Sequence, residues 1–236
     1  MIQFIPETGS TNADLAARLA AGEGWAEGRW LVVDRQNAGK GRQGRAWFDG
    51  SGNFMGSTVV HLGPGDPPAP SLALVVGLAV IETIADFVPP PRRALLKWPN
   101  DVMIDGAKLS GVLLESSGRS VIVGVGVNLA AAPDLPDRAT IALSAFGPAP
   151  DRDLFARNLA GNLATELGRW RSYGLAPLIA RWLAAAHPPG TPLRVGEPGE
   201  TPTKGTFAGL ADDGALQLRL PDGTTRTIHA GEIRLA

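Results

Sequence analysis

The stretch over residues 71–88 constrains the fold most strongly, because apolar residues occupy every side of the helix that it predicts. Such a helix has no polar face, so other elements must cover it all round, and the prolines at 89–91 end it. Its apolar run, residues 72–81, stops at Glu82 and is shorter than the roughly 20 residues that a membrane span needs. We therefore expect a core helix in a soluble, cytoplasmic protein without membrane contacts.

Composition and charge exclude several classes of protein. The chain has 236 residues, of which 44% are hydrophobic and 19% charged, which suits one globular domain with a small appendage. A net charge of −1 provides no general attraction for nucleic acid, so any anion site must be local. The absence of cysteine excludes disulfides and thiolate chemistry, and the three scattered histidines lack the spacing of a structural zinc site.

Hydrophobic periodicity predicts helices and strands in alternation, followed by strands alone. We expect further helices after Ser10 and over 151–173 and 176–186, and strands over 30–33, 53–62, 94–97, 102–104, 109–114 and 121–129. The predicted apolar face of 151–173 comprises Leu154, Phe155, Leu159, Leu163, Leu167 and Trp170. Residues 36–52 and 130–150 have the composition of loops. A Pro-Pro-Gly linker at 188–190 divides the chain into a larger domain over 1–187 and a small β-barrel over 188–236.

Glycines and cations alternate over residues 39–45, whose sequence is Gly-Lys-Gly-Arg-Gln-Gly-Arg. The glycines allow backbone N–H groups to approach an anion, and the three cations can neutralise phosphate oxygens. The spacing is not that of a Walker A loop. A Gly-x-Gly-x-x-Gly pattern is present, but it lacks the acidic residue and helix of a dinucleotide site. On spacing alone, an anion cradle and a solvated basic turn are equally good interpretations.

A second group of chemically active residues follows the predicted strand 94–97. The run Lys-Trp-Pro-Asn-Asp over 97–101 and the segment Lys-Leu-Ser-Gly over 108–111 place two lysines, an amide and a carboxylate near one end of a sheet. Lysines can offset the negative charge that develops when a carboxylate reacts with a phosphate, and Asp101 can hold a cation or orient an amine. The alternative is an edge-strand bend with solvated lysines, which five unusual residue types in a row make less attractive.

Two further segments are ambiguous. Ser10, Thr11 and Asn12 have the composition of an ordinary helix N-cap, although their hydroxyls and amide could also bind a small neutral polar group. The run Gly-Val-Gly-Val-Asn over 124–128 indicates a strand approached closely by a ligand or by backbone, and a β-bulge explains it equally well.

Taken in order, these segments resemble the biotin protein ligase family. The matching stretches are residues 10–12, 36–47, 97–101, 108–115 and 124–128, and the C-terminal strands ending at Gly231-Glu232-Ile233 look like that family's small barrel. The resemblance implies an α+β fold shared with class II synthetases, in which helices flank a mixed sheet and an SH3-like β-barrel follows. It also favours the phosphate-binding interpretation of residues 39–45.

The resemblance implies an ATP-dependent reaction in two steps. Biotin's carboxylate attacks the α-phosphate of Mg-ATP to give biotinyl-adenylate, and a lysine of a biotin carboxyl carrier protein then attacks this anhydride. ATP, Mg²⁺ and biotin are substrates, no tightly bound cofactor is expected, and a homodimer is possible. The alternatives are a lipoate or octanoate ligase or transferase, whose Arg-Arg-x-x-Gly-Gly-Gly segment is absent here, and a non-catalytic biotin-binding module.

The resemblance also assigns roles to individual residues. The expected catalytic residues are Lys108, Arg42 and Asp101. Biotin is expected at Ser10, Thr11, Asn12, Gln36, Lys108, Gly111 and Leu113. The adenylate and phosphates are expected at Gly39, Lys40, Gly41, Arg42, Arg45, Trp47 and Asn128, with Asn100 and Asp101 as candidate Mg²⁺ ligands.

The sequence departs from the family pattern in two respects. Lys40 stands where the family usually has arginine, so the charge is retained but the planar guanidinium is not. Some members carry an N-terminal winged helix-turn-helix that makes them repressors, whereas here the matching region begins almost at Met1. We therefore expect no operator binding and no DNA partner.

Overall fold

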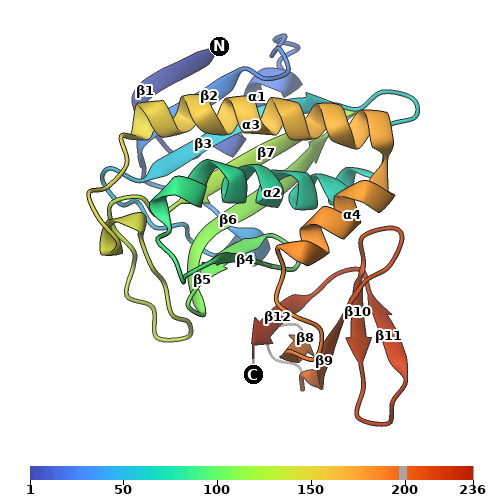
Figure 1. Ribbon diagram of the computed structural model, residues 1–236. Helices are drawn as coiled ribbons and strands as arrows, with labels where there is room; N and C mark the ends of the chain where they lie inside the picture. Colours follow the sequence, from blue (N-terminus) through green and yellow to red (C-terminus); the bar gives the residue numbers. More distant parts are fainter. Residues whose placement is uncertain (197–200, 236) are drawn as a thin grey trace.

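The computed structural model describes residues 1–196 and 201–235, which form two β-sheets with helices on both faces of the larger one (Figure 1). The larger sheet has seven strands in the order β1-β2-β3-β7-β6-β5-β4. Its strands are β1 (Ile2–Thr8), β2 (Trp30–Gln36), β3 (Phe54–His61), β4 (Ala94–Lys97), β5 (Asp101–Ile104), β6 (Ala107–Ser117) and β7 (Ser120–Val127). Strands β1 and β2 are parallel and the other neighbours antiparallel, so the mixed sheet expected from the sequence is confirmed.

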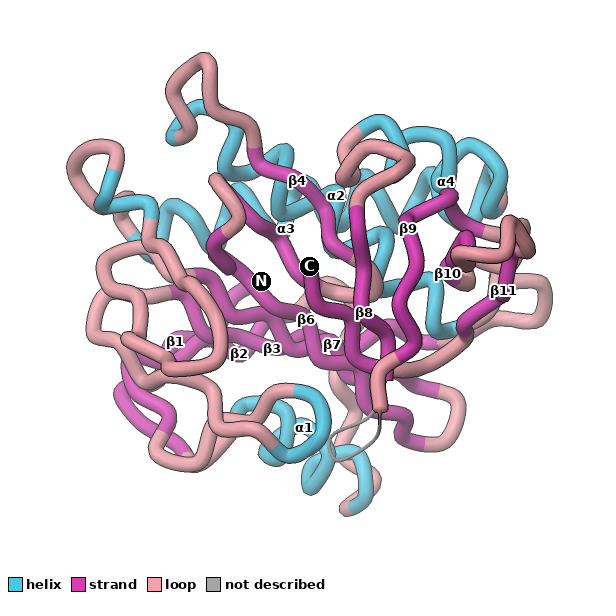
Figure 2. Tube along the Cα trace, turned by 90° about the horizontal axis from the view of Figure 1, so that it is seen from below, coloured by secondary structure: helices cyan, strands magenta, loops and turns pink. Residues whose placement is uncertain are grey.

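Helices cover the two faces of this sheet unequally. Helices α2 (Leu72–Ile84), α3 (Arg152–Tyr173) and α4 (Leu175–Ala184) lie over one face, and α1 (Thr11–Ala20) lies on the other, as the view from below shows (Figure 2). The main apolar core fills the space between the sheet and α2–α4. A smaller cluster under α1 consists of Leu15, Trp25, Leu31, Val59 and Ile122.

Helix α2 is the core helix that the apolar stretch predicts. All of its residues except Ile81 and Glu82 are buried. Short 3₁₀ turns extend it at both ends, so the helical segment Ala69–Phe87 is longer than the apolar run at 72–81 indicated. By length and composition this segment could cross a membrane, but 67% of it is buried against the sheet, α3 and α4, which is the environment of a core helix.

The second sheet is antiparallel and small. It comprises β8 (Pro192–Gly196), β9 (Thr203–Leu210), β10 (Leu216–Arg219), β11 (Thr225–Ile228) and β12 (Glu232–Leu235), in the order β11-β10-β9-β8-β12. Strand β12 returns to pair with β8, which curls the sheet below the larger one (Figure 1). A boundary at residue 188 stays a prediction, because the two sheets share one apolar core. The Trp98 indole also donates a buried hydrogen bond of 3.0 Å to the Gly214 carbonyl.

Three details differ from the sequence-based expectation. Strand β1 was not predicted, because it is a half-exposed edge strand without a continuous apolar run. Leu154 is 55% exposed and does not belong to the apolar face of α3, because it shares a helical stripe with the exposed residues 158, 161 and 165. The strand predicted over 121–129 ends at Val127, so Asn128 lies just beyond it.

The packing of the second sheet on α4 generates a testable prediction. Phe207 of β9 meets the Trp182 ring of α4 edge-to-face, with ring centroids 6.4 Å apart. Phe207→Ala should lower the free energy of unfolding by about 3 kcal/mol because it leaves a cavity at this junction, and Phe207→Leu should cost about 1 kcal/mol. Urea denaturation would measure both. An unchanged midpoint for Phe207→Ala would show that this contact does not hold the two sheets together.

Candidate functional site

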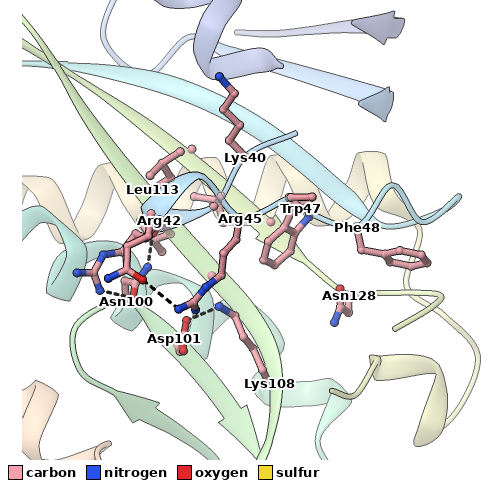
Figure 3. A pocket seen from close by; sticks show the side chains of 18 of the residues that line it. Lys40, Arg42, Arg45, Trp47, Phe48, Asn100, Asp101, Lys108, Leu113 and Asn128 are labelled. Atoms are coloured by element: carbon pink, nitrogen blue, oxygen red, sulfur yellow. Dashed lines mark hydrogen bonds and ion pairs between the residues drawn. The ribbon is translucent and has the colours of Figure 1, made fainter. Parts of the chain in front are cut away.

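A cavity of about 610 Å³ lies on the α1 side of the larger sheet, and its walls come from distant parts of the chain (Figure 3). Every residue assigned to the site from the sequence lines it except Gly39, which packs behind the lining against Gln36 and Trp47. Further lining residues include Lys97, Pro133, Leu135, Arg138, Thr140 and Glu232. The fold therefore brings the separate sequence motifs into one space, while the roles assigned to individual residues stay predictions.

One end of the cavity is polar and uncharged. The backbone N–H of Thr11 donates to Gln36 Oε1 at 2.8 Å, and the Thr11 hydroxyl lies 2.6 Å from that of Ser57. Asn12 bonds the same Ser57 hydroxyl at 2.6 Å. Ser10 is the N-cap of α1, although its oxygen is 3.5 Å from the Ala13 N–H. The N-cap interpretation therefore holds for Ser10, while binding of a small polar group by this segment stays a prediction.

Gly124 and Gly126 of strand β7 line the side of the cavity that the larger sheet forms, here called the glycine floor. A Cβ on Gly124 would lie 2.3 Å from Asn12 Oδ1, and one on Gly126 would lie 2.2 Å from the Trp47 ring. Strand β7 pairs regularly with both neighbours here, so a bulge does not explain these glycines. The close approach expected from the sequence exists, but it is made by the side chains of Asn12 and Trp47 and not by backbone.

Asp101 lies between two lysines in the lining of the cavity. Its carboxylate oxygens are 2.8 Å from Lys97 Nζ and 2.5 Å from Lys108 Nζ, and its side chain is only 9% exposed. Burial alone would raise the pKa of Asp101, but the two ammonium groups outweigh it and hold that pKa well below its usual value. The cluster has two positive charges and one negative charge, which favours an anionic ligand.

This charge distribution bears on the candidate Mg²⁺ ligands. Both carboxylate oxygens of Asp101 already accept from ammonium groups, which would repel a divalent cation, and Asn100 Oδ1 accepts from Arg42 at 3.4 Å. Among residues 1–196 and 201–235, no group of three or more His, Asp or Glu side chains could hold a metal ion. Binding of Mg²⁺ by Asn100 and Asp101 stays a prediction, and the phosphates of ATP would have to supply other ligands.

The loop over residues 39–45 is folded back on itself. The Trp47 N–H donates to the Gly39 carbonyl at 2.8 Å, and the Gly41 N–H donates to the Arg45 carbonyl at 2.7 Å. Its tip is a 3₁₀ turn, Arg42–Gly44. Lys40 is exposed and points away from the lysine–aspartate cluster (Figure 3). The other two cations of the loop, Arg42 and Arg45, connect it to residues outside the loop.

Those contacts reach the second sheet. Arg42 donates to Asn100 Oδ1 and to the Gly231 carbonyl, each at 3.4 Å. Arg45 forms an ion pair with Glu232 at the start of β12. Burial would raise the pKa of Glu232, but the Arg45 hydrogen bond and the nearby arginines lower it overall. The C-terminal strand thus anchors the loop, which lines part of the cavity.

Sequence reasoning missed several lining or supporting residues. Lys97 is one of the two lysines expected to offset negative charge but is not among the assigned site residues, and only the structure shows its contact with Asp101. Ser57 interrupts the apolar strand β3, which was the available signal for a buried polar role. The contribution of residues 133–140 and of Glu232 depends on tertiary contacts that no local pattern indicates.

Comparisons with known proteins agree with this arrangement. Residues 5–130 match the Biotin/lipoate A/B protein ligase family, and residues 192–235 match the Biotin protein ligase C terminal domain. The chain belongs to this ligase family. It is 38% identical to the biotin–[acetyl-CoA-carboxylase] ligase of Paracoccus denitrificans, with 98% of each chain covered. It is 35% identical to that of Mycobacterium tuberculosis, over 98% of this chain and 88% of the relative.

A solved structure of another protein is similar to this chain over its whole length. The biotin protein ligase of Aquifex aeolicus in complex with biotin and ATP superposes with a TM-score of 0.85 at 25% identity, over 100% of this chain and 99% of the other. The match spans both sheets, so the C-terminal barrel expected from the sequence is confirmed along with the mixed sheet.

The anchoring of the loop generates a prediction about its mobility. Glu232→Gln removes the charge that holds Arg45, so trypsin should cleave within residues 39–45 about fivefold faster, as expected for the loss of roughly 1 kcal/mol. The control is Asp222→Asn in the exposed turn of the same sheet. Equal cleavage rates in the two variants would show that Glu232 does not restrain the loop.

Proposed function

We propose that the protein is a biotin protein ligase, which activates biotin with Mg-ATP and transfers it to a lysine of a biotin carboxyl carrier protein. The observation that carries the proposal is the order of chemistry along one cavity. Asn12 of the neutral polar end lies against Gly124, and Lys108 of the lysine–aspartate cluster lies against Gly111, which pairs with Gly126 two residues along β7. Arg42 of the cationic loop reaches Asn100, next to Asp101. This order matches the ring, the carboxylate and the phosphates of biotinyl-adenylate.

In the first step, an oxygen of the biotin carboxylate attacks the α-phosphorus of ATP, and the bond to pyrophosphate breaks. Negative charge accumulates on the phosphoryl oxygens, so a nearby ammonium group stabilises the transition state. Lys108 is held by Asp101 and lies 5.7 Å from the centre of the Trp47 ring. When it turns from Asp101 to the arriving anions, Lys97 still neutralises Asp101.

In the second step, the lysine amine of the carrier attacks the biotinyl carbonyl and AMP leaves. The low pKa of Asp101 makes this carboxylate a poor proton acceptor, because both lysines stabilise its ionised form. We therefore expect Asp101 to orient the amine by accepting a hydrogen bond, while the proton passes to solvent.

The loop over residues 39–45 would protect the intermediate. An acyl-adenylate hydrolyses if water enters, so a loop that closes over it raises the yield of transfer. Arg42 and Arg45 connect this loop to Asn100 and to Glu232, and both have guanidinium groups suited to phosphate oxygens. Trp47 covers the glycine floor where the ligand's chain would pass.

The polar end of the cavity favours biotin over lipoate. Thr11, Asn12, Gln36 and Ser57 form a buried hydrogen-bonding surface. Biotin's ring carries N–H and C=O groups that can pair with it, whereas a dithiolane ring offers neither and would leave these groups unpaired. The proposal needs neither DNA nor a membrane, fits an ATP-containing cytoplasm, and is compatible with a monomer or a homodimer.

Mass spectrometry of the carrier tests the function directly. The protein is incubated with a biotin carboxyl carrier domain, Mg-ATP, and either biotin or lipoate. We expect the carrier to gain the mass of one biotinyl group and to remain unmodified with lipoate. A gain with lipoate alone would assign the protein to the lipoate branch, and no gain with either would leave it a binding module.

Two variants separate the expected roles of Lys108 and Arg42. Lys108→Ala should reduce pyrophosphate release at least a thousandfold, because it removes the ammonium group nearest to the charge that develops in adenylation. Arg42→Gly should still form adenylate but release it early, so that unrelated lysines become biotinylated. If Arg42→Gly blocked pyrophosphate release as fully as Lys108→Ala, this division of roles would be wrong.

A further inference from the structure

Lysine is rare in this chain, and most of its lysines lie at the candidate site. Only four of the 22 Lys and Arg residues are lysines, namely Lys40, Lys97, Lys108 and Lys204. The first three line the cavity, whereas Lys204 lies on strand β9 of the second sheet and does not. An acyl-adenylate formed in the cavity is therefore close to three amines of the protein itself.

Two of these three amines are held as ammonium ions. An amine attacks a carbonyl carbon only in its neutral form, in which the nitrogen has a free electron pair. Lys97 Nζ and Lys108 Nζ lie 2.8 Å and 2.5 Å from the carboxylate oxygens of Asp101, and both side chains are largely buried. Loss of a proton by either lysine would leave the buried carboxylate with one counter-ion instead of two. These two amines are therefore poor acceptors of an acyl group.

Lys40 differs from them because nothing holds its ammonium group. Its side chain is exposed and makes no hydrogen bond or ion pair with residues 1–196 or 201–235. It points away from the lysine–aspartate cluster in the structure (Figure 3). A lysine side chain is a flexible four-carbon stem, so without a partner it can turn toward the cavity that it lines.

The backbone, in contrast, fixes Lys40 at the neck of the loop over residues 39–45. Lys40 forms an isolated β-bridge with Ala46. The flanking residues Gly39 and Gly41 form backbone hydrogen bonds of 2.8 Å and 2.7 Å with the returning side of the loop. Trp47, which follows Ala46, rests on the glycine floor. The Lys40 amine is therefore tethered beside the floor, even when the tip of the loop moves.

A lysine at this position can react in a way that an arginine cannot. A guanidinium group stays charged in proteins and has no free electron pair for attack, whereas an ε-amine can lose its proton and become a nucleophile. The other two cations of the loop, Arg42 and Arg45, are arginines. Lys40 is thus the single acyl acceptor that the sequence places in this loop.

We propose that Lys40 is a site of self-biotinylation in the absence of a carrier. The Lys40 amine attacks the biotinyl carbonyl, and an amide bond forms between Nζ and the carbonyl carbon. The bond from that carbon to the phosphate oxygen breaks, AMP leaves with the electron pair, and the proton of the amine passes to solvent. The proposal rests on the proposed ligase function, which supplies the anhydride. The modification removes one positive charge from the loop.

Tethering favours Lys40 over the other free amines of the protein. An amine on a short flexible tether acts at an effective concentration of about a millimolar or more. The exposed Lys204 and the amino group of Met1, which is 90% exposed, meet only adenylate that has left the cavity. Water hydrolyses part of that released adenylate before it reaches them. We therefore expect a label that is concentrated on Lys40.

Mass spectrometry of the protein itself tests the proposal. The unaltered protein is incubated with biotin and Mg-ATP but without carrier, and hydroxylamine is added to trap adenylate that leaves the cavity. Peptide mapping should find one biotinyl group on Lys40, at about tenfold or higher occupancy than on Lys204 or Met1. The half-time should stay within about twofold when the protein is diluted tenfold, because the reaction is intramolecular.

Variants and the carrier provide the controls. Lys40→Arg keeps the positive charge but removes the nucleophile, so it should lose the label, and its pyrophosphate release is measured in the same sample. Lys204→Arg is the matched control and should be labelled on Lys40 like the unaltered protein. Added carrier domain should suppress the Lys40 label, because its lysine competes for the same anhydride. The peptide map of the unaltered protein decides the site even if Lys40→Arg is inactive.

Failure of the self-biotinylation proposal and failure of the ligase function give different results. The proposal is overturned by equal labelling of Lys40 and Lys204, by a label on Lys97 or Lys108, or by a half-time that lengthens in proportion to dilution. It is also overturned if a protein that biotinylates the carrier does not label itself. A protein that neither releases pyrophosphate nor modifies the carrier would instead overturn the ligase function.

Discussion

The alternation of side chains along strand β7 is the constraint on which both the core and the site depend. Val121, Val123, Val125 and Val127 face the helices and belong to the main apolar core. Gly124 and Gly126 face the other way, where Asn12 and Trp47 occupy the space that a Cβ would fill. Because the side-chain period of a strand is two, one central strand can be wholly apolar on one face and, beyond Ile122, bare on the other. The bare face leaves room for the cavity, while the valine face stabilises the sheet beneath it.

The charges of Asp101 and its two lysine neighbours suit an anionic ligand that binds and is later released. Asp101 is buried and would be costly as an isolated ion, but the two lysines on either side compensate it. The excess positive charge is thereby held in place with only partial exposure of the two lysine side chains to solvent. A ligand carboxylate or phosphate can replace Asp101 as the partner of Lys108 while Lys97 remains, so neither state leaves a buried charge uncompensated. This exchange of partners would allow one lysine to serve both steps of the proposed adenylation and transfer reaction.

The second sheet completes the cavity. Its strand β12 carries Glu232 to the loop over residues 39–45, and its backbone at Gly231 accepts from Arg42. The Trp98 indole and the packing of Phe207 on Trp182 join this sheet to the larger one. A loop rich in glycine loses much conformational entropy when it is ordered, and its like charges repel one another. Contacts with a distant strand offset this cost and hold the loop in one conformation. The C-terminal sheet is therefore part of the site as well as of the fold.

Local sequence patterns determined much of this protein. The core helix α2, most strands of both sheets and the long helix α3 follow from periodicity, since burial on one or all sides selects the residue types directly. The resemblance of ordered motifs indicated the ligase family, and every site residue that it assigned lines the cavity except Gly39. Periodicity missed β1, whose edge position leaves no apolar signal, and misplaced Leu154, whose neighbours on its helical stripe are exposed. Only the tertiary structure decided which side chains meet across the cavity. The glycines of β7 receive Asn12 and Trp47, Asp101 lies between Lys97 and Lys108, and Asn12 bonds both Ser57 and Glu115, because each contact joins residues from separate elements.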